Sequence, residues 1–189
     1  MNARFLVLGV LHRGDFHPYE IKRRLEAAMV ECYIGVDVGT LYYAVRQLER
    51  EGLIDAVAQE RVPRGGIRTI YRITDNGRAE FCDLLHRQFE TDGPAPETLY
   101  GALLFVHLAN RQRVEEALRR RISHLDDLIA KLDPIREELA SKIGTGGEHL
   151  LRHIDLQRRL DRDWLNGLLA DIESRGIRDV ADARALARS

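Results

Sequence analysis

The stretch over residues 37–54, DVGTLYYAVRQLEREGLI, has two chemically different faces when it is read as a helix. Read at the period of a helix, one side is an apolar stripe of Leu41, Ala44, Val45 and Leu48. The opposite side carries hydrogen-bond donors and cations: Thr40, Tyr43, Arg46, Gln47 and Arg50. Arginine binds guanine edges and phosphates, glutamine binds adenine, and hydroxyl groups hold phosphates. This face therefore has the chemistry of a surface that reads a base sequence.

A plain solvated helix face is the alternative interpretation of the same residues. Arginines on a helix often pair with neighbouring acids, and Glu49 and Glu51 are within reach. The two adjacent tyrosines are expected to have different roles. Tyr43 should face outwards, whereas Tyr42 should lie partly in the core and brace this helix. The elements around the helix decide between the two interpretations.

Two helices are expected before this stretch. The mostly apolar residues 4–12 predict a short first helix. The second helix should begin at Pro18, because the first helical turn tolerates proline. In the third helix Asp37 is a plausible N-cap, and Gly52 should end the helix, as a glycine after the last turn commonly does.

A β-hairpin is expected after the third helix. Residues 53–61 alternate roughly, and residues 67–73, IRTIYRI, are rich in β-branched and aromatic side chains. Residues 62–66, VPRGG, form a turn cluster between them, and Thr74 should cap a further helix over 75–89. Three arginines surround the predicted turn: Arg61, Arg64 and Arg68. Three helices followed by a hairpin make a winged helix-turn-helix, in which the third helix enters the major groove and the hairpin contacts the backbone or minor groove.

The second half of the chain reads as helical. Residues 91–96, TDGPAP, mark the best boundary, which predicts a DNA-binding domain over 1–92 and a helical domain over 93–189. The fold class expected is mainly α with a small β-hairpin. Two long amphipathic helices, around 114–143 and 148–174, have apolar stripes that need either each other or a second chain. We expect a symmetric homodimer; the alternative is an intramolecular hairpin packed on the first domain.

Several classes of function are disfavoured by what the 189 residues contain. No apolar run approaches the roughly 18 residues that span a bilayer, so a cytoplasmic protein without membrane partners is expected. The net charge of −1 argues against a non-specific polyanion binder. No Ser/His/Asp or Cys/His arrangement in the sequence suggests a catalytic nucleophile, so no enzyme activity and no cofactor are expected. His149 and His153 are spaced to share a metal, yet no acidic residue lies between them as in zinc proteases, and no metal site is predicted.

Three segments together resemble the PadR family of bacterial transcriptional regulators. They are HPYEIKRRL (17–25), GTLYYAVRQLEREGLI (39–54) and RTIYRITDNGRAEF (68–81). The resemblance covers about the first 90 residues, and it extends more loosely to IDLQRRLDRDWLNGLLADI (154–172), which is similar to the helical dimerisation domain of longer members. Many members have a proline where this chain has Tyr43. The substitution leaves the expected fold unchanged but makes the base preference hard to transfer.

The resemblance implies a homodimeric repressor that occludes a promoter and is released by a small, often phenolic or drug-like effector. A dimer with two winged domains should bind a pseudo-palindromic operator in double-stranded DNA. An effector would bind between the winged domain and the C-terminal helices, where the candidate wall residues are Tyr100, Phe105 and Trp164. Ordinary core or interface packing is the alternative for each of them. The alternative function is a winged-helix adaptor that binds proteins and no DNA.

Overall fold

The computed structural model describes residues 3–28, 30, 38–61, 66–93, 98–139 and 144–177. The chain forms two compact units, residues 1–109 and residues 110–189, and each is described here by itself. Within the described ranges, none of the helices combines the length and the apolar character that crossing a bilayer requires.

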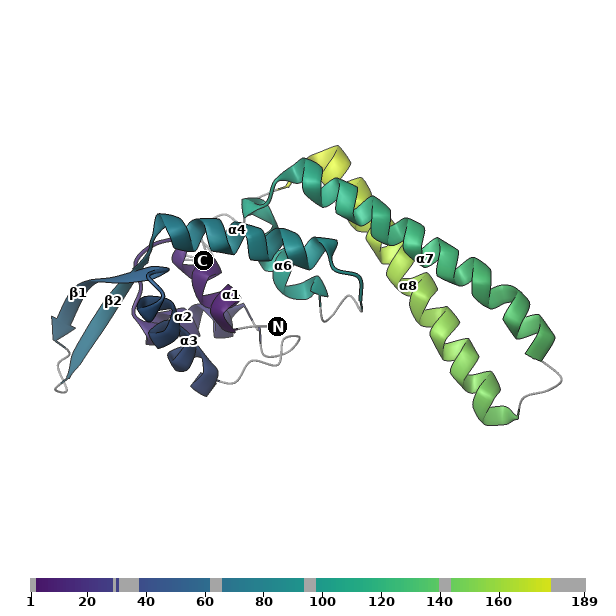
Figure 1. The fold of residues 1–189 in the computed structure, drawn as a ribbon, viewed down its shortest axis with the longest axis horizontal. Coiled ribbons are helices and arrows are strands. Elements are labelled where there is room, and N and C mark those ends of the chain that lie inside the picture. The colour runs from purple at the N-terminus through teal and green to yellow at the C-terminus, as the bar shows by residue number, and fades with distance from the viewer. Residues whose placement is uncertain are drawn as a thin grey trace, which may run out of the picture. The chain divides into compact units, whose positions relative to one another are not determined.

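The first unit is a set of short helices around α1 (Figure 1). Its elements are α1 (Ala3–Leu11), α2 (Pro18–Ala27), α3 (Val38–Arg50), β1 (Ile54–Arg61), β2 (Ile67–Ile73), α4 (Asp75–Glu90), α6 (Tyr100–Leu104) and the 3-10 turn η2 (Val106–Leu108). Apart from Arg4, helix α1 is apolar, and it packs against α2, α3 and α4. A helix with no polar face is stable only when its neighbours bury it on several sides, so α1 forms the centre of the core.

The ends of these helices follow the local signals in the sequence. Pro18 occupies the first turn of α2, and His17 caps that helix with its Nδ1 atom, which accepts from the Glu20 amide at 3.1 Å. Thr74 caps α4 by accepting from the Gly77 amide at 3.1 Å. Gly52 ends α3 with a φ of 68°, a conformation that favours glycine. The predictions for Pro18, Thr74 and Gly52 are confirmed, whereas Asp37 lies outside the described residues.

The predicted hairpin is present and antiparallel. Ile54 pairs with Ile73 at its base and Arg61 with Ile67 towards its tip, with an irregularity between Ala56 and Ala58. Beside β2, the backbone of Phe16 exchanges two hydrogen bonds with Tyr71, at 3.1 and 3.0 Å. Three helices and a hairpin joined in this way form a winged helix-turn-helix, which confirms the predicted fold class for this half of the chain.

Helix α6 and the turn after it complete the core of the first unit. Phe105 is 5% exposed, and its ring meets those of Phe5 and Phe81 edge-on at 5.4 and 5.5 Å. The same ring covers Gly9 of α1 so closely that a Cβ atom there would lie 2.5 Å from it. The two compact units meet at 109/110, whereas the sequence places the domain boundary at 92/93.

The second unit is a hairpin of two long helices, α7 (Arg111–Leu139) and α8 (Thr145–Arg175), which run side by side (Figure 1). Apolar residues fill the seam between them: Val114, Leu118, Ile129 and Leu132 from α7, and Leu165 and Ile172 from α8. Ion pairs border the seam, with Arg119 bound to Glu173 at 2.5 Å and Arg159 to Asp133 at 3.0 Å. Such exposed pairs add little stability, so the apolar seam holds this hairpin together.

A second apolar set on α8 stays exposed in the single chain. Leu150, Leu156 and Leu160 are 59, 57 and 69% exposed, and Trp164 is 36% exposed. The stripe expected on one side of this helix is thus only partly buried by α7. A contiguous exposed patch of large apolar side chains commonly marks an interaction surface.

Candidate nucleic-acid interface

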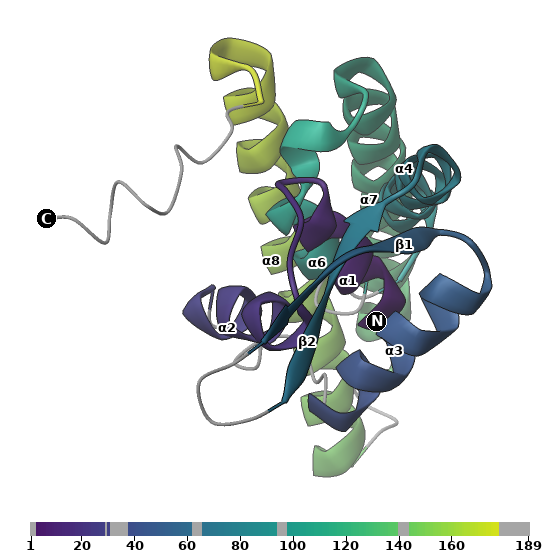
Figure 2. The same cartoon turned by 90° about the vertical axis from the view of Figure 1, so that its left-hand side faces the viewer.

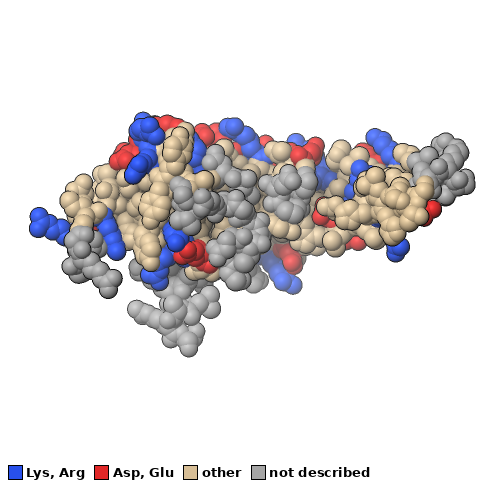
Figure 3. Space-filling model, turned by 90° about the horizontal axis from the view of Figure 1, so that it is seen from below, with Lys and Arg blue, Asp and Glu red and all other residues tan. Residues whose placement is uncertain are grey.

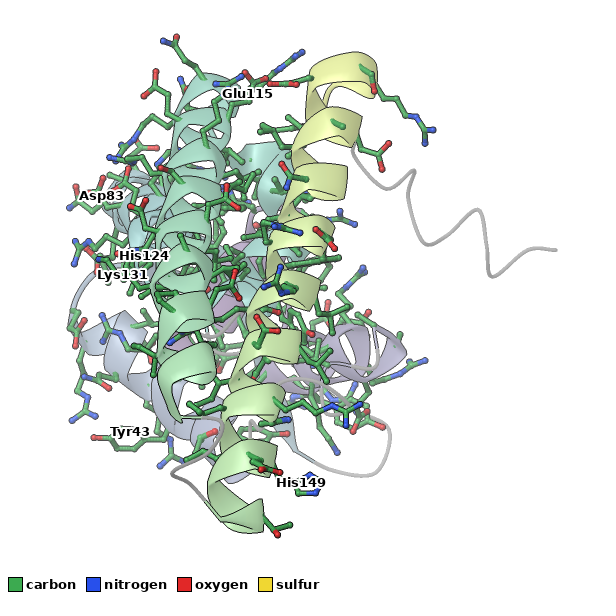
Figure 4. All side chains as sticks on the ribbon, turned by 90° about the vertical axis from the view of Figure 1, so that its right-hand side faces the viewer. Tyr43, Asp83, Glu115, His124, Lys131 and His149 are labelled. Carbon is green, nitrogen blue, oxygen red and sulfur yellow. The ribbon has the colours of Figure 1, made fainter. Side chains whose placement is uncertain are left out.

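Helix α3 divides into a buried face and an exposed face, as its sequence indicates. Leu41, Ala44, Val45 and Leu48 are at most 5% exposed, and they anchor the helix on α1. On the other side Tyr43 is 63% exposed and points away from the ribbon (Figure 4). Thr40, Arg46 and Arg50 are also exposed, and Gln47 is half-buried. Four of the five residues predicted to read DNA are therefore open to a partner.

The acidic neighbours of these arginines also bind residues outside α3. Glu51 forms an ion pair with Arg4 at 2.6 Å, and Arg4, first among several groups, lowers the pKa of the Glu51 carboxyl. Glu49 accepts a hydrogen bond at 3.2 Å from the hydroxyl of Tyr71 in β2. The guanidinium of Arg50 donates to the carbonyl of Arg46 at 3.2 Å. Because a hydrogen bond from Gln47 and the charge of Arg50 also lower the pKa of Glu51, the solvated-face interpretation stays an alternative for this helix.

Tyr42 differs from its expected role as a partly buried brace, because 42% of it is exposed. The apolar stripe of α3 runs through Leu41, Val45 and Leu48, and successive residues on a helix are turned about 100° apart. Tyr42 therefore lies beside the stripe and not within it. The prediction that the two tyrosines separate into an inner and an outer one is wrong for Tyr42.

The wing carries two of its three predicted arginines within the described residues. Arg61 and Arg68 are exposed near the tip of the hairpin, and Arg64 lies outside the described residues. The guanidinium carbon of Arg68 lies 6.0 Å from the centre of the Tyr19 ring of α2. Figure 3 shows Lys and Arg side chains where β1 and β2 project from the first unit. Cations at this place suit a narrow groove with a strongly negative potential.

Two side-chain contacts set the position of the wing within the first unit. The Tyr71 hydroxyl bonds to Glu49 of α3, and both Nε and Nη2 of Arg72 bond to the Asp15 carboxylate at 2.5–3.1 Å. Hydrogen bonding from Arg72 also lowers the pKa of Asp15. Sequence reasoning missed these positioning residues, because nothing local in the chain pairs positions so far apart in number.

The candidate wall residues of an effector site lie in different surroundings. Tyr100 is half-buried in α6, and Phe105 is enclosed in the core of the first unit. Trp164 belongs to the second unit, where 36% of it is exposed. The surroundings of Phe105 agree with the alternative interpretation, ordinary core packing, and the effector site itself stays a prediction.

The histidines of α8 show no sign of a metal centre. His149 and His153 are both exposed, and His149 lies near the start of α8 (Figure 4). Among the residues that the structure describes, no three His, Cys, Asp or Glu side chains come close enough together to hold a metal ion.

Comparison with known families gives a match to the "Transcriptional regulator PadR-like family" over residues 7–83. The matched segment runs from α1 to α4, so it contains α3, both strands of the wing and the exposed residues of the candidate interface. No curated protein matches the chain.

Several solved structures are similar to the chain. PadR of Bacillus subtilis in complex with operator DNA is 20% identical, with a TM-score of 0.40, and the match covers 89% of this chain and 98% of that one. A PadR-like transcriptional regulator from Bacillus cereus is 24% identical, with a TM-score of 0.38 and coverages of 92% and 99%. PadR of Bacillus subtilis in complex with p-coumaric acid is 18% identical, with a TM-score of 0.36 and coverages of 90% and 95%.

Proposed function

We propose that the chain, whose residues 7–83 match the PadR-like family of transcriptional regulators, is a homodimeric repressor that binds a specific DNA sequence. The observation that carries the proposal is the outer face of α3. Tyr43 is 63% exposed there beside exposed Arg46 and Arg50, while the opposite face is buried. A helix that leaves an aromatic ring and two guanidinium groups uncovered, next to an arginine-bearing wing, fits a major groove with the wing beside it.

Each residue of the interface has a proposed role. Arg46 and Arg50 read guanine edges or bind phosphates, and Gln47 reaches adenine. Thr40, in the first turn of α3, holds a phosphate, and Tyr43 donates to a phosphate or packs on a sugar. Arg61, Arg64 and Arg68 contact the backbone or the minor groove from the wing. Because Tyr43 replaces the proline of many relatives, we expect the operator to differ from theirs.

The homodimer rests on the exposed leucines and the tryptophan of α8. Two such chains related by a two-fold axis would bind half-sites about 10 bp apart or a multiple of that spacing, because both winged units must approach the same face of the DNA duplex. A dimer bound to an operator within a promoter would then block the promoter without any further interaction. Release by a small aromatic effector requires that the effector bind the DNA-incompetent form of the dimer more tightly than the competent form.

A footprint on the promoter nearest the protein's own gene tests the proposed function. We expect protection of a pseudo-palindrome, and loss of protection with at least one member of a library of small aromatic compounds. Protection of a single half-site would contradict binding as a symmetric dimer. No protection of any upstream duplex would favour the alternative function, an adaptor that binds proteins.

Replacing Arg46 by alanine tests the reading role of α3. The variant should bind its operator about 1–3 kcal/mol more weakly and lose preference at one base pair, because a bidentate contact to guanine is removed. Binding to a panel of operators with single substitutions measures both effects. An equal loss on every member of the panel would assign Arg46 to a phosphate instead.

A further inference from the structure

Gln47 differs from its neighbours in the candidate interface, because it is half-buried whereas Arg46 and Arg50 are exposed. Its terminal amide has two different sides, an oxygen that accepts hydrogen bonds and an NH2 group that donates them. The side that faces the groove decides which bases the amide can bind, because adenine and cytosine present amino donors there while guanine and thymine present oxygen acceptors. The residues that hold this amide therefore bear on the base preference of α3.

Glu51 is the neighbour of Gln47 one helical turn further along the chain. Residues at this spacing of four lie side by side on one face of a helix. The backbone amide of Glu51 donates to the carbonyl of Gln47 at 3.0 Å, so the helical arrangement extends to Glu51. The pKa of the Glu51 carboxyl is lowered first by a hydrogen bond from Arg4 and further by one from Gln47. Because a carboxylate only accepts, Gln47 turns the NH2 side of its amide towards Glu51.

Glu51 is itself held by Arg4 of α1. The Nη1 atom of Arg4 donates to Oε1 of Glu51 at 2.7 Å, and its Nη2 atom lies 2.6 Å from Oε2. One planar guanidinium thus binds both carboxylate oxygens, an arrangement that fixes direction as well as distance. The Arg4 side chain is only 17% exposed, and α1 packs against α3 (Figure 2). This ion pair is therefore better shielded from water than a pair between two exposed side chains.

The backbone that carries Glu51 is fixed as well. The amides of Gly52 and Leu53 donate to the carbonyls of Glu49 and Leu48 at 3.0 and 2.9 Å, and these bonds close the end of α3. The Leu48 side chain is buried. The Glu51 side chain therefore projects from a defined backbone position, with Arg4 on one side of its carboxylate and the Gln47 amide on the other.

We propose that Arg4 is a positioning residue for base recognition, which acts through Glu51 to hold the Gln47 amide with its oxygen towards the groove. This inference rests on the proposed function. In that orientation Gln47 accepts from the amino group of adenine or cytosine, and its second N–H can donate to N7 of adenine. Without Arg4 and Glu51 the amide can turn over and present its NH2 group to the oxygen of guanine or thymine.

The experiment measures base preference at a single base pair. The full chain and its Gln47→Ala variant are compared by fluorescence anisotropy on the footprinted operator and on a panel with every base pair substituted. The base pair at which the variant loses preference is the one that Gln47 reads. Reversing that base pair exchanges its amino and oxygen groups between the strands. The penalty for reversal is a ratio of two affinities, so a change that weakens binding to all duplexes equally leaves it unaltered.

Arg4→Met keeps an apolar side chain and removes the guanidinium, and Glu51→Ala removes the carboxylate and decides the question if Arg4→Met does not fold. Both should show a reversal penalty about 3–10-fold smaller than the parent's, as for one lost hydrogen bond to the amide. In a Gln47→Ala background, Arg4→Met should change no base preference further. Arg87→Met, at an exposed position of α4 outside the candidate interface, is the matched control and should keep the parent's penalty. Thermal melting shows which variants are folded.

Other outcomes overturn one proposal or both. A parent chain that binds no duplex overturns the proposed function, and this inference with it. A parent that binds, together with Arg4→Met and Glu51→Ala variants that keep its full reversal penalty, overturns the inference alone and leaves Arg4 as a brace between α1 and α3. A Gln47→Ala variant with the parent's preference at every base pair also overturns it, since Gln47 would then read no base. An effect of Arg4→Met that persists in the Gln47→Ala background does the same, because Arg4 would then act by another route.

Discussion

At the scale of single residues, His12 at the end of α1 is held in its neutral form. The guanidinium of Arg78 lies 3.2 Å from its Nδ1 atom, and because arginine only donates, that atom must accept. The ring lies 4.6 Å from that of Phe81. Burial first, then the charge of Arg78 and that of His107, lower the pKa of His12 from 6.5 to about 4. Protonation would place a second positive charge against Arg78, so the fold itself opposes it.

This histidine predicts loss of stability in mild acid. The folded chain stays neutral at position 12 while the unfolded chain binds a proton below pH 6.5, so the stabilisation present above pH 6.5 is lost as the pH falls towards 4. Allowing for the partial exposure of the ring, we expect a loss of about 1–2 kcal/mol from this group. The paired carboxyls of Asp15 and Glu51 have lowered pKa values. The stability that they contribute is present above the ordinary carboxyl pKa and is lost only as the pH falls below it.

Urea unfolding followed by circular dichroism between pH 7 and 5 measures the effect. His12→Asn keeps an acceptor near Nδ1 but cannot titrate in this range, so its free energy of unfolding should be lower than the parent's at pH 7 and fall less with pH. His124→Asn, at an exposed position of α7, is the matched control and should retain the parent's slope. A parent and a His12→Asn variant with the same slope would show that His12 is not held neutral.

At the scale of elements, the wing and α4 meet through a backbone contact that has no room for a side chain. A Cβ atom on Gly77, in the first turn of α4, would lie 2.0 Å from the carbonyl oxygen of Leu53 and 2.9 Å from the Ile73 side chain. The amide of Thr74 donates to that same carbonyl at 3.1 Å. These contacts hold the start of α4 against the base of the hairpin. The direction in which the hairpin projects therefore depends on them.

Gly77→Ala should therefore destabilise the first unit by about 2–3 kcal/mol, since the helix must shift from the hairpin to admit the methyl group. A Cβ atom on Gly167 of α8, in the second unit, would have no described atom within 4 Å apart from its own helix backbone and chain neighbours, so Gly167→Ala should leave the stability of the first unit unchanged. Thermal melting by circular dichroism compares the two substitutions. Equal effects of the same sign would contradict the close approach at Gly77.

Local signals in the sequence predict most of these elements, while contacts between distant residues escape them. Pro18 and Thr74 mark the starts of the helices that follow them, and IRTIYRI forms its own strand. Residues adjacent in the sequence are therefore enough to predict these elements. Phe105 covers Gly9 across most of the first unit, and no periodicity links the two. Periodicity also gives a face and not a depth, so it does not show how much of the α8 stripe is covered, and Leu160 on that stripe is 69% exposed. On α3 the division of faces is predictable because its stripe is regular.

At the scale of the whole molecule, α8 has more apolar surface than the described part of its own unit covers. The side chains of α7 bury Leu165 and Ile172, yet Leu156, Leu160 and Trp164 stay exposed at steps of four residues. Residues four apart lie on one face of a helix. Among the described elements of this unit there is no third helix to cover that face, so a second copy of the chain is the partner we propose. The same two-fold axis would set the spacing of the two recognition helices on DNA.

Leu160→Glu tests this proposal most directly. Leu160 is 69% exposed in the single chain, so the charge should cost the hairpin little, whereas burying a carboxylate in an apolar interface without a partner is strongly unfavourable. We expect the variant to sediment as a monomer with an unchanged helical spectrum, and to bind DNA more weakly because the two half-sites are no longer bound together. Val57→Glu, at a 41% exposed position on β1, introduces the same charge in the first unit and should leave the mass that of a dimer. A Leu160→Glu variant that remains dimeric would place the dimer interface away from this face of α8.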